Sequence, residues 1–228
     1  MKFTSFFFSS IVFYLFLSCS TNDSNSPILS SMEDVDGNKY TTVKIGTQTW
    51  MQSNLNVSHY RNGAIIPYVQ DPNEWYNLTT GAWCYYEHLT ENGIVYGKLY
   101  NWYAVNDSRG LAPEGWHIPN QNDIVVLRSS LGSNENAGGK MKSKTTDWIA
   151  PNVGANNDSY FTALPGGYRS NGGGFYDSKG IFAYFWTSSF VNENSESSYT
   201  YLIQNNSAIL YTSDDLQSAG HSVRCVKD

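Results

Sequence analysis

The residue types that most often carry out catalysis are few in this sequence. Histidine occurs four times, at His59, His88, His117 and His221, and no two histidines have the i and i+4 spacing of a helical zinc pair. His117 belongs to a Gly-Trp-His-Ile-Pro turn, where a packed, hydrogen-bonded side chain is expected. A G-x-S-x-G elbow, a P-loop and a dinucleotide fingerprint are missing from the sequence. We therefore predict no catalytic residues and no cofactor.

The acidic residues are scattered along the chain. Asp214 and Asp215 are neighbours in a predicted turn, so their side chains should point apart. A glycosidase needs two carboxylates about 5 to 10 Å apart, and the sequence alone leaves such a pair open. Asp34 and Asp36 resemble the start of a calcium loop, but Ile45 stands where that loop needs a glutamate. We interpret this segment as a turn and predict no metal ion.

The residues best suited to bind a ligand lie in the segment PGGYRSNGGGFYDSKG, residues 165–180. It falls between two predicted strands and is expected to be an exposed loop, where recognition commonly occurs. The predicted ligand-binding residues are Tyr168, Asn171, Phe175, Tyr176, Asp177 and, in the next strand, Tyr184. Aromatic rings stack on sugar faces, and asparagine supplies neutral hydrogen bonds. The alternative, left open here, is that these rings pack back onto the sheet.

Two helices and several short strands would have to position this loop. Residues 98–105 carry apolar side chains along one side of a short helix. A second helix is predicted after Asn120, the N-cap, with Asp123 reaching back to the free amides and Gly132 ending the helix. Strands at residues 40–45 and 48–51 should form a hairpin. Further strands are predicted at residues 160–164, 183–188, 198–204, 208–211 and 222–226.

A series of distinctive motifs follows in order along residues 34–227: DVDGNKYTTVKIGTQTWMQSNLNV, WYNLTTGAWCYY, YGKLYNWYAVND, GLAPEGWHIP, AGGKMK, FTALPGGYR, FWTSS and SVRCV. This series resembles the Fibrobacter succinogenes major paralogous domain family. The order of helix, GWHIP, second helix and final SVRCV strand is more distantly similar to the formylglycine-generating-enzyme branch of the C-type-lectin-like fold. The resemblance implies an α+β, C-type-lectin-like fold, with two short helices packed on small antiparallel sheets and long polar loops.

The activities of those distant relatives do not carry over to this chain. Formylglycine-generating enzymes use two neighbouring cysteines near the end of the domain, whereas Cys225 is the one cysteine in that region. The Glu-Pro-Asn and Trp-Asn-Asp motifs of calcium-dependent lectins do not occur in the sequence. The family resemblance itself implies secreted or surface domains of undefined activity.

Cysteine pairing gives a further prediction. With Cys19 assigned to a lipid, Cys84 and Cys225 form an even pair in an oxidising compartment. A disulfide between them would close a loop of more than 100 residues, which is worth about 4 to 5 kcal/mol in the chain-entropy model. The alternative is two buried thiols that never meet.

The N-terminus predicts secretion and a membrane anchor. Residues 1–18 combine one lysine with an apolar run too short to span a bilayer of about 30 Å, as in a signal peptide. Leu17 and Ser18 precede Cys19 as in a lipobox, although Phe16 replaces the usual aliphatic residue. We predict lipidation at Cys19, a flexible tether over residues 19–31 and an outer-membrane location, on the cell surface or the periplasmic face. The alternative is an ordinary secretory signal.

Residues 32–228 are expected to form one domain, because turn residues recur throughout without a second boundary. Charged residues make up 15% of the chain and its net charge is −6, so nucleic acid is a poor partner. The first functional hypothesis is a non-catalytic binding module for carbohydrate or another extracellular ligand. The second is a structural or assembly domain that binds an envelope protein. The third is a hydrolase whose carboxylates the sequence does not pair.

Overall fold

The computed structural model describes Met1 and residues 29–228. Of the predicted signal peptide, only Met1 is among the described residues, and Cys19 lies outside them. Strand β1 (Leu29–Glu33) pairs antiparallel with β2 (Lys39–Ile45), from Leu29 opposite Val43 to Glu33 opposite Lys39. The tether predicted for residues 19–31 therefore ends earlier, because its last three residues belong to a strand.

The first five-stranded sheet has the order β1-β2-β3-β12-β6. In β2, buried Tyr40, Thr42, Val43 and Ile45 are interspersed with exposed residues, and Gly46 at φ 60° turns the chain into β3 (Gln48–Met51). The predicted hairpin is thus confirmed. The last strand, β12 (Val226–Lys227), pairs antiparallel with β3 on one side and with β6 (Trp116–His117) on the other. The C-terminus is therefore built into the sheet that begins the domain.

The second five-stranded sheet has the order β11-β10-β9-β7-β8. Its strands are β7 (Gly166–Arg169), β8 (Tyr176–Lys179), β9 (Phe182–Phe190), β10 (Ser197–Gln204) and β11 (Tyr211–Leu216). The pair β7–β9 is parallel and the other pairs are antiparallel, so the sheet is mixed. The strands predicted at residues 183–188 and 198–204 are confirmed.

Three other predicted strands are wrong in part or in full. Residues 160–164 form no strand, because Tyr160 and Thr162 have positive φ angles. Residues 208–210 of the strand predicted at 208–211 have no regular secondary structure, and β11 starts only at Tyr211. Of residues 222–226, only Val226 joins a named strand, while Ser222 makes an isolated bridge to Phe185.

Five α-helices and a 3-10 turn complete the described part of the chain. They are α1 (Pro72–Tyr76), η1 (Tyr86–His88), α2 (Thr90–Tyr96), α3 (Trp102–Val105), α4 (Gln121–Ser130) and α5 (Asn134–Met141). The helix predicted after Asn120 is confirmed as α4, with the reciprocal hydrogen bonds of a capping box between Asn120 and Asp123. The helix predicted over residues 98–105 is shorter, because β5 (Leu99–Tyr100) first pairs with β4 (Trp83–Cys84) and Asn101 then caps α3.

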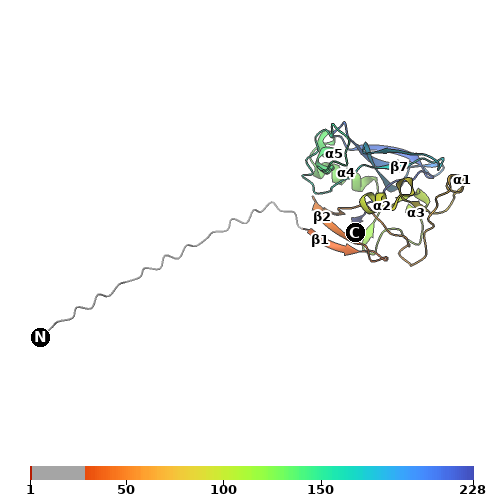
Figure 1. The fold of residues 1–228 in the computed structure, drawn as a ribbon, viewed down its shortest axis with the longest axis horizontal. Helices are drawn as coiled ribbons and strands as arrows, with labels where there is room; N and C mark the ends of the chain where they lie inside the picture. The colour runs from red at the N-terminus through yellow and green to blue at the C-terminus, as the bar shows by residue number, and fades with distance from the viewer. Residues whose placement is uncertain (2–28) are drawn as a thin grey trace.

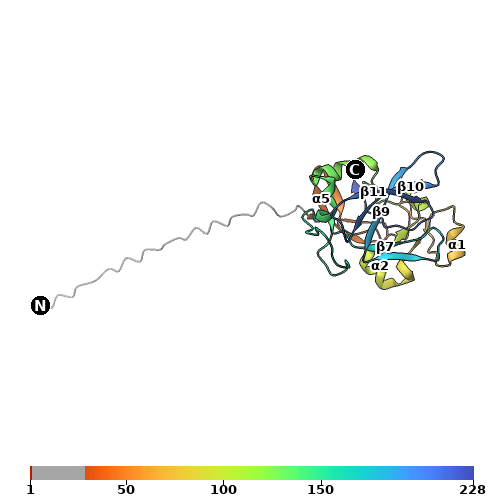
Figure 2. The same ribbon diagram turned by 90° about the horizontal axis from the view of Figure 1, so that it is seen from above.

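The fold is α+β, as expected, and mostly β. It has five α-helices in its described part instead of the two expected, and its second sheet is mixed instead of antiparallel. Figure 1 shows the two sheets in the body of the domain, with β1–β2 below and β7 among the blue strands above. Helix α5 lies at one end of the domain and α1 at the other in Figures 1 and 2, and Figure 1 shows α4 next to α5. The pocket considered below is beside α5.

The disulfide predicted between Cys84 and Cys225 is not present in the core. Cys84 and Cys225 are free, fully buried thiols. Cys84 belongs to a cluster with Val69 and Trp75, whereas Cys225 belongs to a different and larger cluster. Because β4 and the segment before β12 bury these side chains in separate parts of the core, the thiols are structural and do not meet.

Candidate functional site

The predicted binding loop at residues 168–177 is mostly a β-hairpin. Tyr168 pairs with Asp177 and Arg169 with Tyr176, and the Ser170 amide donates to the Phe175 carbonyl over 2.8 Å. The turn is fixed against α1, because the buried Arg169 guanidinium donates to the Gly173 carbonyl over 2.7 Å and stacks on the Trp75 ring at 4.1 Å. The expectation of an exposed loop over residues 165–180 is therefore wrong for most of the segment, because residues 166–169 and 176–179 are strands.

The hairpin divides the predicted binding residues between different surfaces. Tyr168 and Asp177 are partners and share one face of the hairpin, whereas Tyr176 lies on the other. Tyr168 packs on Tyr184 with 5.3 Å between ring centroids. The Tyr176 ring instead packs on Tyr86 at 5.2 Å. These rings do not line one common concavity.

The remaining contacts of these rings are those of packed side chains. The Tyr176 hydroxyl lies 3.0 Å from Nε2 of His88 and 3.7 Å from Sγ of Cys84, and burial raises the pKa of Tyr176. Burial likewise raises the pKa of Tyr184 to about 12. Asn171, at the hairpin turn, is half-buried, and the ring of Phe175 is 60% exposed. Only Phe175 among the predicted aromatic residues is largely free to meet a ligand.

The histidines are engaged in polar contacts with neighbouring side chains. Nε2 of His117 lies 3.1 Å from Asp123 and Nδ1 lies 2.8 Å from Asp228, so both ring nitrogens already face carboxylates. His221 is fully buried, and its Nε2 lies 2.9 Å from Oδ2 of Asp215. In the described part of the chain, no group of three His, Cys, Asp or Glu side chains could hold a metal ion.

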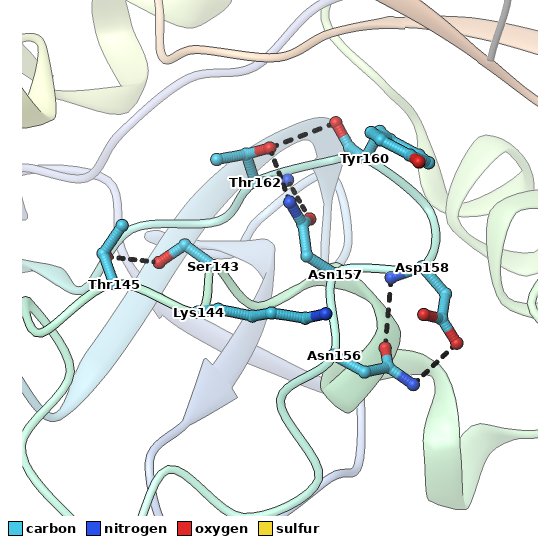
Figure 3. Close-up of a pocket in the computed structure, with 8 residues that line it drawn as sticks. All are labelled: Ser143, Lys144, Thr145, Asn156, Asn157, Asp158, Tyr160 and Thr162. Carbon is cyan, nitrogen blue, oxygen red and sulfur yellow. Dashed lines mark hydrogen bonds between the residues drawn. The ribbon is translucent and has the colours of Figure 1, made fainter. Parts of the chain in front are cut away.

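A different region of the surface has the shape of a binding site. An open hollow of about 780 Å³ lies beside the end of α5 (Figure 3). One wall consists of Ser143, Lys144 and Thr145, and the other of Asn156, Asn157, Asp158, Tyr160 and Thr162. The volume is within the range of small-ligand sites, which run from about 300 to 1,000 Å³. Unlike in most such sites, every residue of the lining has a side chain with a polar group, and no aliphatic side chain takes part.

Hydrogen bonds within the lining hold its amides in fixed directions, as Figure 3 shows. Oδ1 of Asn157 accepts from the Thr162 amide over 2.9 Å, and Nδ2 of Asn157 donates to the Thr162 hydroxyl over 3.1 Å. Nδ2 of Asn156 donates to Asp158 over 2.7 Å. The Ser143 and Thr145 hydroxyls lie 2.9 Å apart. The lining therefore presents preorganised neutral donors and acceptors.

The backbone of this lining is strained. Asn157, Tyr160 and Thr162 have φ angles of 54°, 56° and 57°. A positive φ is tolerated by asparagine but is a genuine outlier for a β-branched residue such as threonine. Such outliers cost of order 1–3 kcal/mol each and cluster at functional sites. Within this strained segment, the Tyr160 side chain is 42% exposed and lines the hollow.

Hydrogen bonds from neighbouring residues, including a buried lysine, hold this strained backbone in place. The fully buried Lys142 ammonium donates to the carbonyls of Val153 and Ser207 over 2.7 and 3.0 Å, and burial lowers the pKa of Lys142 to about 8. The Ser159 amide donates to the Lys140 carbonyl over 3.1 Å, which ties the lining to α5. Nε2 of Gln52 donates to the Tyr160 carbonyl over 2.8 Å. The segment is thus held in place from several sides.

Sequence reasoning missed this hollow. The signal was the run Asn156-Asn157-Asp158 before an aromatic residue, in a segment otherwise interpreted as polar connection and strand. Short polar side chains of this kind favour turns with positive φ. The sequence did not predict that residues 156–158 lie opposite residues 143–145, because this arrangement depends on how α5 packs.

Comparison with known proteins bears on the family of the chain. None of the described helices is long and apolar enough to cross a membrane. No curated protein and no solved structure matches the chain. Residues 43–227 match the Fibrobacter succinogenes major domain (Fib_succ_major), in agreement with the motifs of the sequence. Because that match covers most of the chain, the chain belongs to the Fibrobacter succinogenes major domain family.

Proposed function

We propose that this chain is a cell-envelope-anchored module that binds carbohydrate without converting it. The observation that carries the proposal is the polar hollow at residues 143–162, with the Tyr160 ring exposed at its rim. A sugar offers an apolar face that can stack on an aromatic ring and hydroxyls that pair with neutral donors and acceptors. The Asn156, Asn157 and Thr162 side chains supply such partners.

The chemistry of the lining supports binding over turnover. Glycoside hydrolysis uses two carboxylates that flank the bond, whereas Asp158 is the one carboxylate among the residues that line the hollow. Its Oδ2 already accepts a hydrogen bond from Asn156.

The proposal includes a lipid anchor at Cys19 and an outer-membrane location. The apolar run at the start of the sequence and the Leu17-Ser18-Cys19 motif support it. It also includes a C-type-lectin-like fold as the finer description of the α+β domain. The support for this part is the order of the motifs along the sequence. Exchange of Cys19 for alanine is expected to move the protein from the membrane fraction to the soluble fraction. Unchanged partitioning would contradict the anchor.

The binding function is tested on a glycan array with the full chain and three tyrosine or phenylalanine variants. Tyr160→Ala should weaken the binding of any glycan that the parent chain retains by about fivefold or more, as expected for an exposed aromatic anchor. Tyr76→Ala is the matched control, since Tyr76 is 61% exposed on α1 at the opposite end of the domain. It should leave binding unchanged.

Phe175→Ala separates the hollow from the hairpin. If Phe175→Ala weakens binding and Tyr160→Ala does not, the ligand occupies the hairpin and the site proposed here is wrong. If no glycan is retained by the parent chain, carbohydrate binding fails, and a structural or assembly domain becomes the better hypothesis.

A further inference from the structure

A second hollow adjoins the first at the Tyr160 ring. It measures about 310 Å³ and lies between the end of β2, the Gly46 turn and the C-terminal end of α4. Asp158 and Tyr160 line both hollows. The tyrosine therefore stands on a ridge with a polar depression on each side. A ligand that stacks on this ring can extend in two directions.

The two hollows share an excess of positive charge. Lys144 lines the first hollow, and Lys44 and Lys140 line the second. In the part of the chain that the structure describes, none of these lysines belongs to an ion pair. Asp158 is the one carboxylate in either lining. Three ammonium groups thus face one carboxylate on a chain whose net charge is −6.

The three lysines differ in whether their ammonium groups already make hydrogen bonds within the protein. Nζ of Lys140 donates to the Leu131 carbonyl over 2.7 Å and so caps the end of α4. Lys44 and Lys144 make no hydrogen bond through their amines to other described residues, and both side chains are exposed. Their charges are available to a ligand, one in each hollow. In this respect they differ from Lys142, whose ammonium is buried beneath the same segment.

Building on the proposed function, we infer that the ligand is an extended, negatively charged sugar chain, which bears carboxylate or sulfate groups. It runs over the Tyr160 ring with units in both hollows. The ring and the asparagine amides contact the sugar faces and hydroxyls, while Lys44 and Lys144 face the anionic groups on either side. A monosaccharide occupies one hollow and gains little from the other, so affinity should rise with chain length until both are filled.

The test uses the full chain and defined anionic oligosaccharides of two and six units: oligogalacturonate, oligoguluronate and chondroitin sulfate. Each is compared by calorimetry with its carboxyl-reduced counterpart, which for chondroitin sulfate is also desulfated, so that the counterpart has the same length without the charge. At least one anionic hexamer should bind about tenfold or more tighter than its neutral counterpart and than its own dimer. Raising the salt from about 0.05 to 0.5 M should weaken this binding several-fold, since the contacts are exposed to solvent.

Charge variants show whether the ligand spans the ridge. Lys44→Gln and Lys144→Gln should each weaken hexamer binding about two- to fivefold, the range for an exposed ion pair, and the double variant should combine the losses. Lys39→Gln is the control, because Lys39 is exposed on the same strand as Lys44 and lines neither hollow. Tyr160→Ala should weaken the hexamer more than either lysine variant.

Several results would overturn the inference. Binding of neutral hexamers alone would leave the proposed carbohydrate function intact and remove the anionic preference. Equal losses in Lys39→Gln and Lys44→Gln would mean that general attraction, not the second hollow, is at work. Equally tight binding of a glutamate hexapeptide would show that charge suffices without a sugar. If neither the anionic nor the neutral chains bind, this inference fails, and the glycan array decides separately whether the proposed carbohydrate function fails as well.

Discussion

At the scale of single residues, the unusual feature of this domain is the burial of cations without carboxylate partners. Arg169 is fully buried and donates to the carbonyls of Val69, Gln70 and Gly173 over 2.7 to 2.9 Å. Lys142 is likewise surrounded by carbonyls. Burying a charge is costly unless it is hydrogen-bonded, and each of these cations meets that condition through loop backbone. They thereby fix the irregular segments that a mostly β domain must accommodate.

The two neighbouring rings of the β7–β8 hairpin should differ sharply in their contribution to stability. Tyr176→Ala removes a half-buried ring that packs on Tyr86 and is expected to lower the free energy of unfolding by about 2–3 kcal/mol. Phe175→Ala removes a ring that is 60% exposed, so the change should be within about 0.5 kcal/mol. Urea denaturation of both variants measures the difference. A larger loss in Phe175→Ala would contradict the packing described here.

The pair formed by Asp215 and His221 should contribute to acid stability. Burial alone would raise the pKa of the Asp215 carboxyl, but the hydrogen bond and charge of His221 outweigh it, and the folded pKa lies below the usual 3.8. The unfolded chain therefore takes up this proton first as the pH falls. The stabilisation is complete above about pH 4 and is lost as the pH falls through the folded pKa.

Exchange of Asp215 for asparagine tests this effect. The variant should be less stable than the parent chain at neutral pH, and the gap in unfolding free energy should shrink as the pH is lowered from about 5 to 2. Chemical denaturation at several pH values measures both curves. A gap that stays constant over this range would mean that the carboxylate charge contributes nothing to the pair.

At the scale of elements, helix α5 decides whether the candidate pocket exists. A Cβ atom on Gly139 would lie 2.5 Å from the Gly154 carbonyl oxygen, so the helix approaches the chain before the pocket as closely as only glycine permits. The Gly139 carbonyl in turn accepts from the Asn156 amide over 3.1 Å. The small residues of α5 thus position the asparagine wall of the first hollow.

Gly139→Ala should therefore damage both stability and binding. The added methyl group must displace backbone, which typically costs about 1–3 kcal/mol, and the shift should carry Asn156 away from its place in the lining. Gly172→Ala is the control, since its nearest neighbour to an added Cβ is the Ser170 hydroxyl at 4.0 Å. Thermal unfolding and glycan binding of the two variants provide the comparison. Unchanged stability in Gly139→Ala would argue against this close packing.

At the scale of the whole molecule, the two ends of the domain are joined by hydrogen bonds and not by a covalent bond. Strand β12 fits between β3 and β6, and the Met51 amide donates to the Cys225 carbonyl over 3.1 Å. Burial raises the pKa of the Cys84 thiol to about 11 and also raises that of Cys225. Both thiols should therefore be unreactive while the domain stays folded.

Thiol labelling of a Cys19→Ser variant, purified without reductant, checks this arrangement. Native protein should react at neither cysteine, and protein in denaturant should react at both, Cys84 and Cys225. The reason is that unfolding exposes the thiols and restores their ordinary pKa. If neither cysteine is labelled after unfolding, the two form a disulfide, which would contradict the free thiols described here.

The sequence by itself determined those features that depend on local interactions. The hairpin around Gly46 and helix α4 after Asn120 were predictable, because a turn glycine and a capping box act within a few residues. The family was predictable too, since its motifs are continuous pieces of sequence, and residues 43–227 confirm it. The same local signals led to errors where distant contacts compete, as at Leu99, which pairs with Cys84 instead of continuing into the helix.

Only the tertiary structure decided which side chains share a surface. Tyr168 and Tyr176 lie close in sequence, yet strand pairing sends them to opposite faces of the hairpin. Cys84 and Cys225 are a natural pair by count, yet separate parts of the core enclose them. Conversely, Lys44 and Tyr160 are far apart in the chain, yet both line the second hollow, because the Gly46 turn after β2 packs against Ser130 at the end of α4. Such juxtapositions arise from long-range packing, for which a single sequence has no local signal.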